Sequence, residues 1–118
     1  VERVEEETRG IMVSGAKIIS DVESLVRDAL PSGIPGISQL ARHMGMSART
    51  LSRRLSENGI TFRDLVRKTQ ETASRDLLNN SSRSIAEIAF QTGFSEQSAF
   101  NRAFKRWTGM SPVRYRKG

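Results

Sequence analysis

The chain has no cysteine and only one histidine among its 118 residues. Without cysteine there is no disulfide framework, and both thiol chemistry and zinc–thiolate sites are excluded. The single histidine, His43, leaves too few imidazole ligands for a transition-metal site built from protein side chains. We therefore expect no metal and no cofactor, and we interpret His43 as a surface residue.

Long apolar stretches are also missing from the chain. No run approaches the ~20 residues that a helix needs to cross a bilayer, and no signal-peptide pattern opens the sequence. These absences predict a soluble, cytoplasmic protein. Its length suits one domain with a modest hydrophobic core.

Positive charge is unevenly distributed along the chain. The net charge is +6 overall, with a net of −3 in residues 1–30 and of +9 in residues 31–118. Concentrated positive charge is typical of proteins that bind a polyanion. It is weak evidence by itself, because many basic proteins bind no nucleic acid.

No segment shows the alternation of apolar and polar residues that a half-buried strand requires, whereas apolar residues recur at helical spacing. We therefore predict an all-α domain of about seven helices over residues 14–118, after a linker or disordered tail at residues 1–13. Helix starts are marked by Thr61 and by Ser84, which has Glu87 three residues later. The longest helix is predicted at residues 61–79.

Two stretches of the chain resemble each other. Residues Ile37, Leu40, Ala41, Gly45, Met46 and Ser47 match Ile85, Ile88, Ala89, Gly93, Phe94 and Ser95 at a constant offset of 48. After the turn the offset becomes 49, so one extra residue stands at the start of the second helix in the second copy. Each copy has the pattern of a helix-turn-helix unit, at residues 37–56 and 85–106.

The residue types at the turns agree with that interpretation. Gly45 and Gly93 suit the left-handed backbone that ends the first helix of each unit. Ser47 and Ser95 are then expected to cap the second helix. Four large apolar residues would fix the second helices to the core, and we interpret the aromatic ones as core rather than as base-stacking platforms. They are Leu51, Leu55, Phe100 and Phe104, with Phe94 and Trp107 beside them.

The outward faces of the two second helices carry side chains that suit base edges, since Arg can pair with guanine and Asn or Gln with adenine. A solvated helix face would also be polar, but two copies of one pattern in a basic region favour DNA reading. The faces comprise Ala48, Arg49, Ser52, Arg53 and Ser56 in the first copy, and Gln97, Ser98, Asn101, Arg102 and Lys105 in the second. A linker helix of residues 61–79, roughly 27 Å long, would hold the two units near one DNA turn apart.

These motifs carry a family resemblance. The stretch from Gly93 to Pro112, followed by Tyr115-Arg116, closely resembles the signature of the AraC/XylS family of transcription regulators. The stretch from Gly45 to Leu55 resembles the first recognition helix of that family. The resemblance covers roughly residues 31–117. It implies a bacterial regulator domain without enzymatic activity, whose two recognition helices enter adjacent major grooves of duplex DNA. It also implies a separate N-terminal effector-sensing or dimerisation domain, with RNA polymerase as a further candidate partner.

Site residues follow from the resemblance by position. The base-reading residues would be Arg49, Ser52, Arg53, Gln97, Ser98, Asn101 and Arg102. Candidate contacts to the DNA backbone, which position a protein without specifying sequence, are Ser47, Arg54, Arg63, Arg83, Ser95, Lys105 and Arg106. Gly36 stands where the family commonly has a better cap, so we expect the first unit to begin on a weaker helix start.

A protein-interaction module and an enzyme are the two alternatives to DNA binding. The acidic N-terminal helix at residues 14–30 is compatible with a protein-interaction module, which would lack the steep salt dependence of a phosphate-neutralising DNA binder. An enzyme such as a nuclease is disfavoured, because no acid cluster, glycine-rich phosphate loop or Ser/His/Asp group occurs at usable spacing.

Overall fold

Every regular element of the described chain is helical. The computed structural model describes the backbone of residues 2–118 and the side chains of residues 16–118. The elements are α1 (Glu2–Ala29), the 3₁₀ turn η1 (Leu30–Ser32), α2 (Ile37–His43), α3 (Ala48–Glu57), α4 (Phe62–Asn80), α5 (Ile85–Gln91), α6 (Gln97–Thr108) and α7 (Pro112–Lys117). The prediction of an all-α fold with about seven helices is confirmed. Residues 2–13, expected to belong to a linker or disordered tail, are helical in their backbone as the first part of α1, and their role as a linker stays a prediction.

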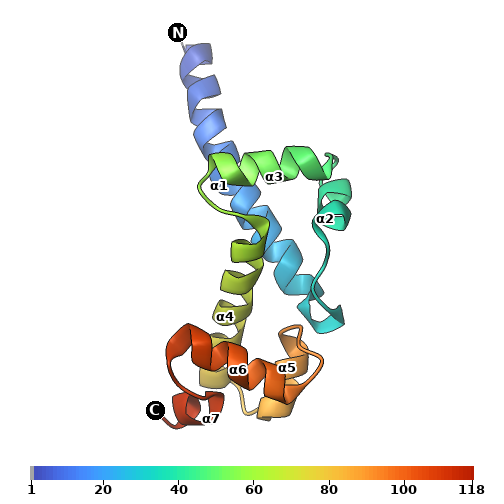
Figure 1. The fold of residues 1–118 in the computed structure, drawn as a ribbon. Coiled ribbons are helices and arrows are strands. Elements are labelled where there is room, and N and C mark those ends of the chain that lie inside the picture. The colour runs from blue at the N-terminus through green and yellow to red at the C-terminus, as the bar shows by residue number, and fades with distance from the viewer. Residues whose placement is uncertain (1) are drawn as a thin grey trace.

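The helices form two groups joined by α4. Figure 1 shows α1, α2 and α3 around one end of α4, and α5, α6 and α7 around the other. Helices α3 and α6 run across the front of this arrangement, one near each end of α4. At ~1.5 Å per residue, the 19 residues of α4 separate the two groups by about 28 Å.

Local capping explains where most of these helices begin. The Oγ of Ser47 accepts a hydrogen bond from the Thr50 N–H at 3.1 Å, and Thr61 accepts one from the Asp64 N–H at 3.1 Å. Ser84 and Glu87 form a reciprocal pair, in which Ser84 accepts from the Glu87 N–H at 3.1 Å and Glu87 accepts from the Ser84 N–H at 3.3 Å. These side chains pair backbone N–H groups that a helix start leaves free. The caps predicted from the sequence at these three serine and threonine residues are confirmed.

The first unit begins differently. Gly36 is the N-cap of α2 and has no side chain to accept a bond, so only its own N–H is paired, with Gln39 Oε1 at 3.4 Å. This long single bond agrees with the weaker helix start expected at Gly36.

Each group of helices has its own hydrophobic core. The first core centres on Val22, Val26, Leu51, Leu55 and Leu65, which have no exposed surface. The second is largely aromatic: Phe100 and Phe104 are fully buried, and Phe94, Trp107 and Tyr115 pack against them. The ring centroid of Phe104 lies 5.2 Å from that of Tyr115 and 6.4 Å from that of Trp107. The predicted core role of these aromatic residues is confirmed.

Two long-range contacts, besides the continuous chain of α4, hold the two groups of helices together. The buried Gln70 of α4 donates from Nε2 to the carbonyl oxygen of Thr92 at 3.0 Å, just beyond α5. Gly93 follows with a φ of 93°, and a Cβ there would lie 3.3 Å from side-chain atoms of both Leu30 and Ile34. Gly93 therefore serves twice, because it takes the left-handed turn and lets the segment after α1 approach the second group closely.

Arg116 of α7 closes the far end of α4. Its guanidinium group donates to four backbone carbonyl oxygens, those of Leu77 (3.4 Å), Leu78 (3.2 Å), Ser81 (3.2 Å) and Arg83 (2.6 Å). The last carbonyls of a helix have no partner within the helix, and an arginine beside them also suits the helix dipole. Arg116 is therefore a structural cap for α4 and for the loop that leads into α5.

Candidate nucleic-acid interface

Helix α3 has a buried side and an exposed side. Leu51 and Leu55 have no exposed surface and fix one side of the helix to the first core. Arg49, Ser52 and Arg53, the predicted base readers of the first unit, are exposed. The amphipathic pattern read from the sequence therefore has the orientation that DNA reading requires.

Helix α6 repeats that arrangement at the other end of α4. Phe100 and Phe104 are buried, while Gln97, Ser98 and Arg102 are exposed. Asn101, also predicted as a base reader, is half-buried at the border between the two sides. Its Oδ1 is buried and has no hydrogen-bond partner within the described side chains.

The two exposed faces correspond residue by residue. With the offset of 49, Arg53 of α3 corresponds to Arg102 of α6, and Arg49 corresponds to Ser98. Arg53 stands two residues before the buried Leu55, and Arg102 stands two residues before the buried Phe104. The structure thus presents an exposed arginine at the same place on both helices.

The prediction that Ser95 caps the second recognition helix is wrong. Helix α6 begins at Gln97, its N-cap is Glu96, and no side-chain hydrogen bond closes this cap. Glu96 is the extra residue behind the change of offset from 48 to 49, and it moves Ser95 one place away from the helix start. Ser95 is exposed, so it stays a candidate backbone contact.

Two acidic side chains on these helices were missed by the sequence analysis. Glu57, at the end of α3, lies 3.5 Å from Arg53, measured from Oε1 to Nε. Glu96 accepts a hydrogen bond from the hydroxyl of Ser98 at 3.3 Å. The four-residue spacing of Arg53 and Glu57 was the available signal for the first pair.

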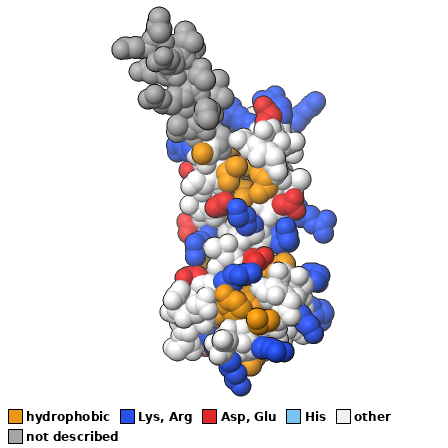
Figure 2. Space-filling model, turned by 90° about the vertical axis from the view of Figure 1, so that its left-hand side faces the viewer, with side chains coloured by type: hydrophobic (Ala, Val, Ile, Leu, Met, Phe, Trp, Pro, Cys, Tyr) orange, Lys and Arg blue, Asp and Glu red, His pale blue; other side chains and the backbone are white. Residues whose placement is uncertain are grey.

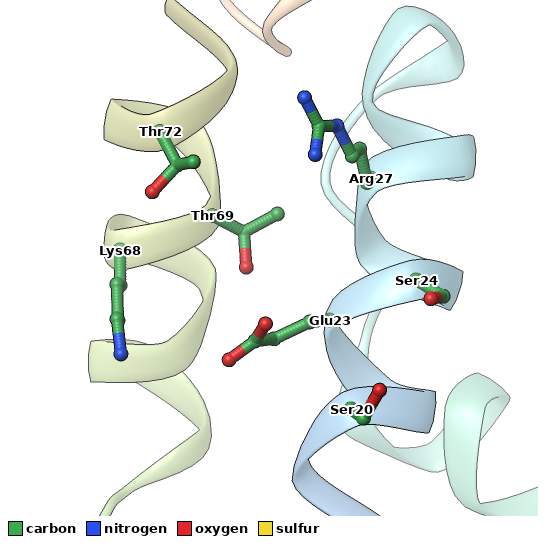
Figure 3. Close-up of a pocket in the computed structure, with 7 residues that line it drawn as sticks. All are labelled: Ser20, Glu23, Ser24, Arg27, Lys68, Thr69 and Thr72. Carbon is green, nitrogen blue, oxygen red and sulfur yellow. The ribbon is translucent and has the colours of Figure 1, made fainter. Parts of the chain in front are cut away.

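All predicted backbone contacts are exposed: Ser47, Arg54, Arg63, Arg83, Ser95, Lys105 and Arg106. They do not all lie on one surface. Arg54 borders a hollow beside α1, together with Lys17 and Asp21. Lys68 lies on another side of α4 from Arg63, in a polar seam of ≈ 120 Å³ between α1 and α4 that Glu23 also lines (Figure 3).

Basic side chains gather on the side of the molecule that bears α3 and α6. Figure 2 views the molecule from the left-hand side of Figure 1, so its right-hand edge is the face that Figure 1 turns to the reader. Lysine and arginine side chains project along most of that edge. Acidic side chains, among them Glu57 and Glu96, interrupt this face, but a mainly basic face spanning both units can still attract a polyanion along its length.

Neither a metal-binding cluster nor a membrane-crossing helix is found in the described part of the chain. No group of three or more His, Asp or Glu side chains there could hold a metal ion. None of the described helices is long and apolar enough to cross a membrane.

The chain is similar to known regulators. The helix-turn-helix domain family matches residues 40–118. The regulator VqsM of Pseudomonas aeruginosa is 37% identical over 92 residues, which are 78% of this chain and 28% of VqsM. The DNA-binding domain of AdpA, solved in complex with a target DNA, superposes with a TM-score of 0.69 at 29% identity, covering 84% of this chain and 89% of that one. An AraC-type DNA-binding domain protein from Chromobacterium violaceum has the same fold, with a TM-score of 0.76 at 21% identity over 89% and 94% of the two chains.

Proposed function

This chain belongs to the AraC-type helix-turn-helix family and is a DNA-binding domain of a transcription regulator, and from that premise we propose that it reads two successive major-groove segments of one DNA duplex. The observation that carries the proposal is the pair of corresponding exposed faces on α3 and α6. The length of α4, about 28 Å, is close to the ~34 Å of one DNA turn. One copy of the domain would then read a site without two-fold symmetry.

The base-reading roles are assigned to the exposed side chains of the two recognition helices. Arg53 and Arg102 are proposed to pair with guanine, because the guanidinium matches the two acceptors of that base in the major groove. Gln97 would suit adenine, and the exposed Arg49, Ser52 and Ser98 complete the set. Asn101 is half-buried with a buried Oδ1, so it would pair with adenine only after its side chain turns outward, because that pair uses Oδ1 as an acceptor. Phosphate contacts from residues such as Lys105 and Arg106 would fix the register.

The chain spans 28% of the length of VqsM. The activity and the partners of a full-length regulator are therefore proposals for this chain. We propose that a separate effector-sensing or dimerisation domain accompanies this one in the full regulator, with RNA polymerase as a further partner. A regulator that reads bacterial DNA would work in the cytoplasm. No catalytic role is proposed.

Selection of binding sites from random duplex DNA tests the main proposal. We expect enriched sites with two conserved blocks about one helical turn, ~10 base pairs, apart. We also expect affinity for the selected site to fall steeply as salt rises, because basic side chains release counterions from the phosphates. Enrichment of one block only would contradict the proposal that both helices read bases.

A substitution at Glu57 tests the role assigned to Arg53. Glu57→Gln is expected to tighten binding to the selected site by about two- to fivefold, because exposed pairs of this kind are worth about 0.3–1 kcal/mol. Arg53 loses this competing partner, and the phosphates lose a nearby negative charge. The measurement is a DNA titration followed by fluorescence anisotropy.

Asp28→Asn is the control for Glu57→Gln. Asp28 is exposed on α1 and lies on neither recognition helix, so its replacement changes the net charge equally. If the two variants gained DNA affinity equally, the gain would be a general effect of net charge, and the specific role proposed for the Arg53–Glu57 pair would be contradicted.

A further inference from the structure

A groove of ≈ 660 Å³ lies between the first half of α4 and α6. Its apolar lining comes from three separate parts of the chain: Ile34 after η1, Phe62 at the start of α4, and Phe94 and Trp107 in the second unit. Ile34 is 50% exposed, and the three aromatic residues are half-buried. Apolar side chains that converge on an open groove and keep accessible surface are typical of a binding surface for another molecule.

The rim of the groove is strongly basic. Arg63 and Arg67 of α4 and Arg106 of α6 line it, and all three are exposed. Within the described part of the chain, none of the three lies within ion-pair distance of a carboxylate. Asp64 is the one acidic residue in the lining. The rim therefore offers three cations against one anion.

This combination identifies the chemistry of the occupant. An amphipathic helix lays apolar side chains, spaced i, i+3, i+4 and i+7, into an apolar groove, and acidic residues beside that stripe would meet the arginine rim. DNA fits less well, because a phosphate backbone gains nothing from the exposed surface of Ile34 and the aromatic residues. We propose that this groove binds an acidic amphipathic helix of a partner protein.

The groove shares two residues, Arg63 and Arg106, with the candidate contacts to the DNA backbone. Arg106 lines the groove, and it also lies one residue after Lys105 and four after Arg102 on the exposed side of α6. A negatively charged helix in the groove would occupy Arg106 and repel the phosphates that approach α6. The bound helix and DNA therefore exclude each other. This second part of the inference rests on the proposed DNA-binding function, whereas the docking itself does not.

The probe is a fluorescent synthetic helix of about 18 residues, or roughly two and a half heptads. It carries leucine at the i, i+3, i+4 and i+7 spacing of helices that bind in grooves, and glutamate on both sides of that stripe. A second peptide carries lysine in place of every glutamate. Fluorescence anisotropy against the whole chain is expected to show the acidic peptide binding at least about tenfold more tightly than the basic one. Equal binding of the two peptides would overturn the proposal.

Two substitutions locate the site, and each has a matched control on α7. Ile34→Ser is compared with Val113→Ser, since Ile34 and Val113 are 50% and 49% exposed. Arg67→Gln is compared with Arg114→Gln, both at exposed arginines. The groove variants are expected to weaken acidic-peptide binding at least about threefold, as loss of one apolar or charged contact of about 0.7 kcal/mol or more would do. The α7 variants are expected to leave it unchanged, and thermal melting checks that all four fold.

DNA titrations complete the test. Ile34→Ser and Arg67→Gln are expected to bind the selected duplex within about twofold of the unsubstituted chain, since neither residue is among the proposed DNA contacts. If these variants weaken DNA binding as much as peptide binding, DNA fills the groove and the proposal is overturned. Unlabelled duplex is expected to displace the acidic peptide, and a ternary complex would overturn mutual exclusion. If the duplex fails to bind at all while the peptide follows the expected pattern, the DNA-reading function fails and the docking site stands.

Discussion

Replacing Phe104 by alanine is expected to lower the free energy of unfolding by about 3–5 kcal/mol, the usual cost of deleting a buried phenylalanine ring. Phe104 has no exposed surface and contacts the rings of Phe100, Trp107 and Tyr115. It therefore joins α6 to α7 as well as filling the second core. Small domains are stable by only about 5–15 kcal/mol, so the melting temperature should fall by roughly 10 °C or more. Thermal unfolding followed by circular dichroism measures the effect.

Phe90→Ala is the matched control for Phe104→Ala. Phe90 lies in α5 of the same unit, but its surface is 54% exposed. The same chemical deletion there leaves little cavity, and surface changes of this kind usually stay within about 0.5 kcal/mol. If the two variants melted at the same temperature, the second unit would not be held together by the aromatic core described above.

Replacing Arg102 by alanine is expected to weaken binding to the selected DNA site by about 1–3 kcal/mol, which is roughly five- to 150-fold. The physical reason is the loss of a bidentate guanidinium–guanine pair, which leaves the base acceptors without their partner. Sites selected by the variant should show relaxed preference at one base pair and unchanged preference elsewhere. Both the affinity and the selected sequences are measured against the unsubstituted chain.

Arg114→Ala separates base reading from general charge. Arg114 is exposed on α7 and its replacement removes the same charge, so it should reduce affinity slightly and for all sequences alike. An Arg102→Ala variant that behaved in the same way, with no change in base preference, would show that α6 is not the base-reading helix of the second unit.

The exposed faces of α3 and α6 were predictable because helical periodicity is a local property. Leu51 and Leu55, or Phe100 and Phe104, are four residues apart, which places them on one side of a helix and leaves Arg53 and Arg102 on the other. The caps at Ser47 and Ser84 depend on residues three places away. The error at Ser95 has the same origin: one inserted residue, Glu96, moves the helix start without changing the local pattern before it.

The sequence by itself determined the helices, the repeated unit and the two exposed faces, since these depend on neighbours within one helical turn. Only the tertiary structure decided how the two units are held relative to each other. Gln70 bonds to Thr92 across 22 residues of chain, and Gly93 meets the segment from Leu30 to Ile34. Arg116 likewise caps a helix that ends 36 residues earlier, at Asn80. Contacts between residues so far apart leave no periodic trace in the sequence. The groove between α4 and α6 is likewise a product of the tertiary structure, because its lining residues, Ile34 and Gln70 among them, come from distant parts of the chain.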